Sequence, residues 1–370
     1  MRASKNKTTH HFESLDAFRG LAAVMIVLYH SQFFVSHIPN DLVKNSYIFV
    51  DFFFILSGFV MAYAYMERIL KGVGLKSFFI LRFARLYPLH LFTLLVWIPY
   101  ISIKIYLYQH GVGETDPTGE NNLVTFIQNL FLLQGFSLST SWNYPSWSIG
   151  VEFYTYLIFY FVVILLGKVS LLWRYAGVVI VSLFSFYLLF SEDFSIWHNL
   201  YRCISEFFLG ALLFELYRNT SFQIKSSFLS SLIEMILMGT MLYTVIYIET
   251  EHGYKYLTLL LFSLIVYFFA IQKKGVISQL LLQKSLQHLG KISYSVYMTH
   301  AIVVTGVYNV LVYTLHLETG SVDGVPTGVI VPYALFLNIV FLVVVVGIST
   351  WTYRHIELYG QSYIKRKFLK

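Results

Sequence analysis

The chain has 370 residues, of which 57% are hydrophobic, 19% aromatic and 12% charged, and its mean hydropathy is +0.65. Because an ordinary soluble domain carries about 25% charged residues, this composition excludes a water-soluble globular protein and predicts a polytopic membrane protein. The formal net charge of +7 is attributed to membrane-flanking loops and not to nucleic-acid binding, and the single cysteine, Cys203, excludes an internal disulfide and a cysteine-based metal site.

Ten apolar segments are long enough to cross a bilayer, which takes about 20 helical residues. We expect these spans at 18–36, 47–66, 86–108, 147–166, 172–190, 200–217, 229–248, 255–271, 294–315 and 328–350. Segment 123–138 is also apolar but is expected to be short and interfacial or re-entrant. Lys and Arg gather in alternate connecting segments, including the 1–15 N-terminal segment and the basic 355–370 tail. We therefore expect an all-α bundle of about ten transmembrane helices, forming one domain over 1–370 with both termini cytoplasmic.

The first span contains two ionisable residues in an apolar setting, Arg19 and His30. Eleven residues of helix place them on one face, about 16 Å apart along the axis. Charged groups inside a membrane helix are costly and usually functional, although Arg19 also suits a snorkelling interfacial residue that Asp16 caps or pairs with. The spacing favours an anion anchor at Arg19 and a proton-transfer group at His30, since neutral imidazole can accept a proton near pH 7.

The second span holds Asp51 near its outer end and the small pair Ser57–Gly58. Asp51 and Ser57 are candidates to line a polar cavity, while small residues equally suit close helix packing.

At the inner entrance of the third span, Arg82 and Arg85 lie three residues apart on one helix face. Two fixed guanidinium groups suit phosphate recognition, although basic residues at this membrane face need no ligand to explain them. Pro88 is expected in the first turn of this span, where proline is tolerated.

The fourth span opens with Trp147, Ser148 and Glu152. Glu152 lies about one turn inside the hydrocarbon and needs a partner there. Because His30 and Glu152 both belong to the outer half of the bundle, we expect them to pair, so that the carboxylate orients the imidazole. Trp147 is either a cavity residue or an interfacial anchor, and Ser148 suits a helix cap as well as a cavity wall.

Two later spans carry further polar patterns. Arg202 and Glu206 form an i, i+4 pair that is expected to be self-neutralising. In the ninth span, Ser293, Tyr297 and His300 share one face, where they either line the cavity or form a structural hydrogen-bond ladder.

Taken together, these stretches resemble the membrane acyltransferase family often called acyltransferase-3, which includes bacterial O-antigen and exopolysaccharide O-acetylases. The resemblance runs from Leu15 to about Glu357. It rests on Arg followed after ten residues by His, on FFFILSGF, on R-x-x-R before Pro, on W-S-x-x-x-E and on SYSVYMTH. Each motif alone is weak, but the five in this order are highly specific.

This resemblance implies transfer of an acyl group, most often acetyl, from acyl-CoA to a sugar hydroxyl. His30 would be catalytic, and Arg19, Arg82 and Arg85 would hold the CoA phosphates. The implied partners are the acyl-CoA donor, a glycan or lipid-linked glycan acceptor and the bilayer of the bacterial cytoplasmic (inner) membrane, with no metal and no permanently bound cofactor. Some members carry an appended esterase-like domain; without one here, we expect the bundle itself to deliver the acyl group.

The mechanism expected is deprotonation of the acceptor hydroxyl by His30, assisted by Glu152, with direct attack on the thioester. A covalent acyl-histidine step is an alternative. The rival functional class is a transporter or flippase that uses the buried charges as a proton or ion relay. A transporter does not explain the spacing of Arg19 and His30 or the paired inner arginines.

Overall fold

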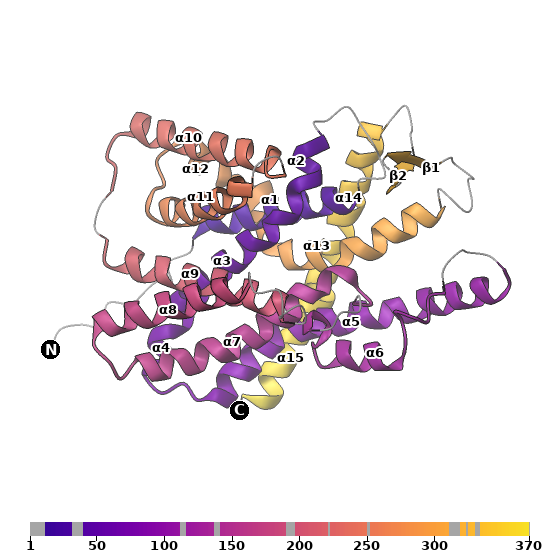
Figure 1. The fold of residues 1–370 in the computed structure, drawn as a ribbon, viewed down its shortest axis with the longest axis horizontal. Helices are drawn as coiled ribbons and strands as arrows, with labels where there is room; N and C mark the ends of the chain where they lie inside the picture. The colour runs from indigo at the N-terminus through magenta and orange to yellow at the C-terminus, as the bar shows by residue number, and fades with distance from the viewer. Residues whose placement is uncertain are drawn as a thin grey trace.

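The structure, a computed structural model, describes residues 12–31, 40–111, 116–136, 141–189, 197–220, 223–249, 252–310, 319–322, 325–329 and 334–369. These residues form a helical bundle in which the long helices pack side by side (Figure 1). A short antiparallel hairpin, β1 (Thr319–Val322) and β2 (Val325–Val329), is the exception to the predicted all-α class.

The first half of the chain contains α1 (Glu13–His30), α2 (Asn40–Lys44), η1 (Asn45–Ile48), α3 (Phe49–Met61), η2 (Ala62–Met66), α4 (Glu67–Leu70), α5 (Leu75–Gln109), α6 (Leu123–Leu130), η3 (Gln134–Phe136), η4 (Tyr144–Ser146) and α7 (Trp147–Leu166). The second half contains α8 (Leu171–Leu189), α9 (His198–Arg218), α10 (Ser227–Ile246), α11 (His252–Ile271), α12 (Val276–Leu281), α13 (Lys284–Asn309), α14 (Ala334–Thr352), η7 (Tyr353–Glu357) and α15 (Leu358–Phe368).

A helix occupies each of the ten predicted span positions. Within the described residues, six continuous helical stretches are both long and apolar enough to cross a membrane, at Asp41–Leu70, Leu75–Gln109, Tyr144–Leu166, Ser227–Ile246, Gly253–Ile271 and Asn338–Phe368. The chain is thus a multi-pass membrane protein, while the count of ten and the cytoplasmic termini stay predictions. In the described part of segment 123–138, which ends at Phe136, the chain forms the short helix α6 and the turn η3, in agreement with the expected short segment.

The ends of several helices differ from prediction. The third span does not begin near residue 86, because α5 starts at Leu75 and Pro88 lies inside it instead of in its first turn. The last span begins at Ala334 instead of residue 328, and the expected basic tail is helical, since α15 continues α14 through η7. Residues 32–36, 190, 311–315 and 330–333 of the predicted spans lie outside the described residues.

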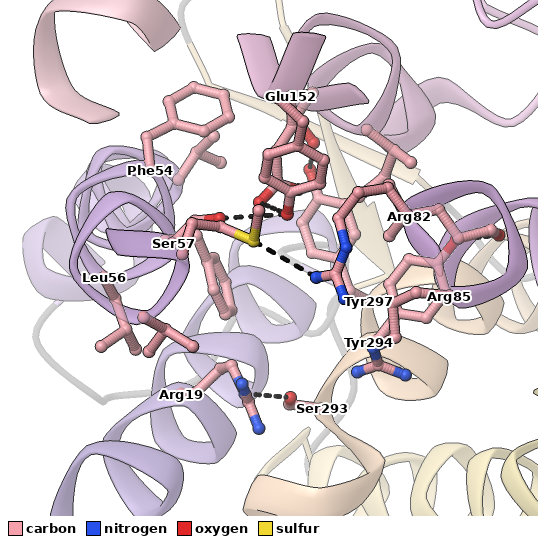
Figure 2. A pocket seen from close by; sticks show the side chains of 18 residues that line it. Arg19, Phe54, Leu56, Ser57, Arg82, Arg85, Glu152, Ser293, Tyr294 and Tyr297 are labelled. Carbon is pink, nitrogen blue, oxygen red and sulfur yellow. Dashed lines mark hydrogen bonds between the residues drawn. The ribbon is translucent and has the colours of Figure 1, made fainter. Parts of the chain in front are cut away.

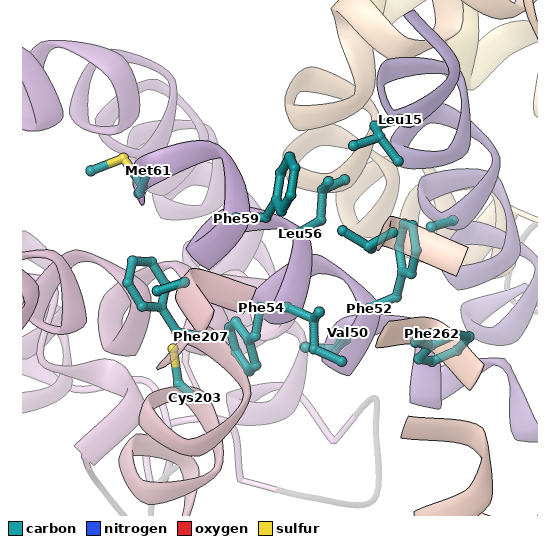
Figure 3. Close-up of a cluster of buried hydrophobic side chains, with 14 of the residues drawn as sticks. Leu15, Val50, Phe52, Phe54, Leu56, Phe59, Met61, Cys203, Phe207 and Phe262 are labelled. Atoms are coloured by element: carbon teal, nitrogen blue, oxygen red, sulfur yellow. The ribbon is translucent and has the colours of Figure 1, made fainter. Parts of the chain in front are cut away.

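The centre of the bundle is α3, whose phenylalanines Phe52, Phe54 and Phe59 are buried among neighbouring helices (Figure 3). Two glycines bring α3 and α9 into backbone contact. A Cβ on Gly58 would collide with the carbonyl group of Phe207, and one on Gly210 would collide with the carbonyl of Ile55. Small residues permit this approach between membrane helices, so the predicted packing role of Gly58 is confirmed.

The first helix packs along α13, and the two run in the same direction. Gly20 lies against Gly290, and ten residues later in both helices His30 stacks on His300. A Cβ on Gly290 would lie 2.2 Å from the carbonyl oxygen of Asp16. This glycine crossing therefore sets how the polar faces of α1 and α13 meet.

We expect Gly290→Ala to lower the thermal stability of the purified protein, because the new methyl group must push the α1 backbone away. Overpacking of this kind costs about 1–3 kcal/mol. Gly306→Ala is the matched control, since Gly306 lies on the same helix with nothing within 4 Å of its missing Cβ. Equal melting temperatures for the two variants in detergent would contradict the tight crossing.

Candidate active site

A cavity of about 170 Å³ lies where α1, α3, α5, α7 and α13 converge. Its polar lining consists of the side chains of Arg19, Ser57, Arg82, Arg85, Ser148, Glu152, Tyr156, Ser293, Tyr294 and Tyr297. Figure 2 shows several of them directed at a common space, although they come from helices far apart in the sequence. Eight residues singled out in the sequence thus share one cavity, namely Arg19, Ser57, Arg82, Arg85, Ser148, Glu152, Ser293 and Tyr297.

Arg82 is the cavity cation without a carboxylate partner among the described residues. Its guanidinium donates to the Tyr65 hydroxyl and to the Met61 sulfur, at 3.2 Å for the latter, and lies 4.4 Å from the centre of the Tyr65 ring. Its Nε is buried and has no hydrogen-bond partner in the described part of the chain. These contacts hold the side chain in place and, in the described ranges, include no ion pair, so an anion in the cavity would be stabilised here.

Arg85 pairs with Glu357 of η7. The Glu357 side chain is 1% exposed and also accepts a hydrogen bond of 2.8 Å from Ser295. The Arg85 guanidinium lies 5.4 Å from the centre of the Tyr294 ring. The charge of Arg85 is therefore already balanced by a buried carboxylate. The pairing of Arg85 with Glu357 was not predicted from the sequence.

Arg19 is also partly compensated. It donates to Asp16 at 2.8 Å, as expected for residues three apart, and to the Ser293 hydroxyl at 3.1 Å. It further contacts the carbonyl of Gly290 at 3.3 Å. Arg19 thus joins α1 to α13 at the glycine crossing while remaining part of the cavity wall.

The acid of the cavity is Glu152 on α7. Its carboxylate accepts a hydrogen bond of 2.6 Å from Tyr156, whose hydroxyl lies 3.1 Å from that of Ser57 (Figure 2). Ser148 is not the helix cap, because it lies inside α7 and its hydroxyl lies 2.7 Å from that of Tyr297. Both hydroxyls also reach the carbonyl of Pro145, at 3.2 and 2.9 Å, and so lock α7 to α13.

His30 lies at the C-terminal end of α1, next to His300. The two imidazoles stack with centroids 5.2 Å apart, and the Tyr144 ring packs on His30 at 4.7 Å. His300 is fully buried, and its Nδ1 lies 3.2 Å from the carbonyl of Val296. Because a carbonyl only accepts, Nδ1 carries the proton of a neutral His300, and its buried Nε2 is left without a partner among the described residues.

The predicted pairing of His30 with Glu152 is wrong. No hydrogen bond or ion pair joins them in the described ranges, and Glu152 is bonded to Tyr156 on the cavity wall. The link between the cavity and the histidines is Tyr297, which lines the cavity and whose ring lies 5.9 Å from that of His300. Ser293, Tyr297 and His300 thus follow one another along one face of α13, but His300, also a candidate to line the cavity, is not among its lining residues.

Asp51 and Trp147 belong to a different cluster. Asp51 is fully buried and accepts two hydrogen bonds of 2.5 Å from Arg202, while Glu206 lies 3.9 Å from the same guanidinium. The ring of Trp147 lies 5.7 Å from it. Asp51 therefore binds α9 and does not line the cavity, and the expected self-neutralising pair of Arg202 with Glu206 is the weaker of the two contacts.

The side chains that contact Arg82 and pair with Arg85 both belong to π-helical turns. Tyr65 belongs to η2 and Glu357 to η7. Such turns occur frequently at functional sites. The sequence offered a signal for Glu357, which is the lone acidic residue in the predicted basic tail 355–370.

Comparison with known proteins identifies the family of the chain. The acyltransferase domain of the acyltransferase-3 type matches residues 12–353. The chain is 36% identical over 154 residues to protein 2 in the picA locus of Rhizobium radiobacter, covering 38% of this chain and 76% of that protein. It is 29% identical to the acyltransferase MdmB of Streptomyces mycarofaciens, covering 40% of this chain and 38% of MdmB.

A third relative is the peptidoglycan O-acetyltransferase OatA of Listeria monocytogenes, 27% identical over 43% of this chain and 25% of OatA. The chain thus spans well under half of the last two relatives. No solved structure matches the chain. Since the matched domain covers nearly the whole chain, the protein belongs to the acyltransferase-3 family of membrane acyltransferases.

Proposed function

We propose that the protein transfers an acyl group, in the simplest case acetyl, from acyl-CoA to a hydroxyl of a cell-surface glycan or its lipid-linked precursor. The observation that carries this proposal is a membrane cavity walled by three arginines, one of which has no carboxylate partner among the described residues. Tyr297 lines this cavity, and its ring also contacts the histidine pair. The three relatives come from bacteria, and OatA is named for O-acetylation of a glycan, which supports a bacterial cytoplasmic membrane as the setting.

In this proposal the phosphates of the donor meet the arginines and its thioester extends toward the histidines. Arg19 and His30 are about 16 Å apart along α1, a span that a long thin pantetheine arm suits. His30 takes the proton of the acceptor hydroxyl as its oxygen attacks the thioester carbonyl. The carbon–sulfur bond then breaks, and the CoA sulfur leaves with the proton from His30.

The supporting role first assigned to Glu152 passes to His300 in this scheme. His300 lies against His30, and its buried, unprotonated Nε2 has no hydrogen-bond partner in the part of the chain that the structure describes. It can accept a hydrogen bond from an acceptor hydroxyl or from His30. Glu152 instead lines the cavity from α7, where it accepts the hydrogen bond of Tyr156.

We expect Arg82→Ala to weaken acetyl-CoA binding by about 10- to 100-fold, since a hydrogen bond to a charged group contributes about 1.5–3 kcal/mol. Calorimetric titration of acetyl-CoA into the purified protein in nanodiscs measures this directly. Lys76→Ala removes the same charge from an exposed position on the same helix and serves as the control.

Saturable binding by the wild type and the control, with loss in Arg82→Ala, would establish the donor site. If the wild type bound neither acetyl-CoA nor any other short acyl-CoA, the donor assignment would be lost. Proton- or sodium-coupled flux would then become the property to measure, because the buried charges would better suit a transporter.

A further inference from the structure

The cavity lined by Arg19, Arg82 and Arg85 is too small for a whole acyl-CoA molecule. Its volume is about 170 Å³, whereas sites that enclose a drug-sized ligand measure about 300–1,000 Å³. The narrow acyl and pantetheine end can enter, but the nucleotide end with its phosphates must remain at the mouth. Two of the three cavity arginines already have carboxylate partners, so the mouth needs further positive charge to hold it.

The C-terminal helix α15 packs against α5, the helix that carries Arg82 and Arg85. It continues α14 through η7 and packs along α5, where a Cβ on Gly360 would lie 2.4 Å from a Pro88 side-chain carbon. Figure 1 shows α15 beside α5 near the C-terminus. The Arg85–Glu357 pair fixes the start of this contact. A segment that the sequence presented as a basic tail is therefore a packed wall next to the arginines.

Lys365 is the cation that α15 brings to the arginines. It follows Glu357 by eight residues, which is about 12 Å along a helix. It is half-buried, whereas its neighbours Arg366 and Lys367 are exposed. Its charge acts on those of Arg82 and Arg85, and no carboxylate pairs with it among the described residues. Like charges gathered in this way repel one another, so a bound anion would stabilise the cluster.

We propose that Lys365 binds the 3′-phosphate at the nucleotide end of acyl-CoA, so that the donor site extends beyond the matched family domain into α15. This inference rests on the proposed acyl-CoA donor. Arg82 then contacts the part of the donor that enters the cavity, and Lys365 meets the terminal phosphate at the mouth. An anionic lipid headgroup offers the same phosphate chemistry at this membrane face, and the experiment separates the two sources.

The experiment compares Lys365→Glu with Lys367→Glu in phosphatidylcholine nanodiscs, which present no net lipid charge. Both variants make the same charge change on the same helix, but Lys367 lies over the rings of Tyr363 and Phe368 on the exposed side. We expect the KM for acetyl-CoA to rise at least 10-fold in Lys365→Glu and less than 2-fold in Lys367→Glu. The kcat should change little, and Lys365→Arg should restore the KM.

A donor without the 3′-phosphate identifies the group that is bound. The wild type should bind 3′-dephospho-acetyl-CoA at least 10-fold more weakly than acetyl-CoA, and Lys365→Glu should lose this discrimination. Equal KM values for the two glutamate variants would overturn the assignment of Lys365. An effect that appears only in phosphatidylglycerol nanodiscs would assign Lys365 to lipid and would also overturn it. Failure of the wild type to bind acetyl-CoA would remove the proposed function itself.

Discussion

His30→Ala is expected to abolish most acyl transfer while leaving donor binding intact. General-base catalysis contributes about 10²- to 10⁴-fold, so kcat should fall by that range. His30 lies about three helical turns from Arg19, beyond the residues that line the arginine cavity, so the KM for acetyl-CoA should stay close to that of the wild type. Transfer of radiolabelled acetyl to membrane glycan gives kcat, and calorimetric titration gives donor affinity.

The matched control for this variant is His288→Ala. His288 lies on α13, and its ring bonds Thr350 at 3.1 Å, away from the histidine pair. It should retain near-normal transfer. A second variant, His300→Asn, retains an amide donor near the Val296 carbonyl but lacks the imidazole Nε2, and a reduced kcat would support the paired arrangement. Near-normal transfer by His30→Ala would show that His30 is not the base.

The second large effect concerns stability and is expected from Arg202→Ala. Arg202 supplies both hydrogen bonds to the fully buried carboxylate of Asp51 and also faces Glu206. Removing one partner of a buried ion pair costs about 3–5 kcal/mol, because the remaining charge is left uncompensated. We therefore expect Arg202→Ala to be recovered in low yield, with a strongly lowered melting temperature in detergent.

Two further variants test whether the loss of stability comes from the buried ion pair. Lys71→Ala breaks an exposed i, i+4 pair with Glu67, so its melting temperature should be unchanged. The double variant Asp51→Leu with Arg202→Met replaces the main ion pair by apolar groups and should be more stable than Arg202→Ala alone. A melting temperature for Arg202→Ala equal to that of the wild type would mean that the cluster of Asp51, Arg202 and Glu206 contributes little to the stability of the fold.

Much of the fold was predictable because the length and hydropathy of an apolar segment identify it as a membrane helix. A helix lies at each of the ten expected positions. The errors fall where hydropathy carries no information. Pro88 lies inside α5, since the segment from Leu75 to Arg85, which was left out of the predicted span because it carries basic residues, already belongs to the helix. The helical state of α15 was hidden by its charge, because its contacts with α5 exist only in the folded bundle.

The candidate site was predictable as a set of residues but not as a set of pairs. Charged and hydroxyl side chains within apolar spans point inward because lipid cannot satisfy them, which selected both Arg82 and Glu152. The sequence placed Arg82 at the inner end of the bundle and Glu152 in its outer half, whereas the structure brings both to one cavity. Which groups meet depends on the rotation of each helix and on distant contacts. Arg85 meets Glu357, which lies 272 residues away, and Asp51 meets Arg202, 151 residues away. No local spacing encodes such partners, and the expected pair of His30 with Glu152 failed for this reason.

The π turn η7 makes the orientation of Glu357 independent of the face that α14 packs in the membrane, whereas a regular helix would couple the two. Each residue of an α-helix turns the chain by about 100°, so the face that α14 packs in the membrane would dictate where Glu357 points. A π turn accommodates one additional residue and resets that phase. The apolar side chains of α14 can therefore vary under the demands of lipid packing without moving the carboxylate that balances Arg85. Deleting a single residue within 353–357 should rotate α15 away from α5 even though every hydrophobic contact of α14 is retained.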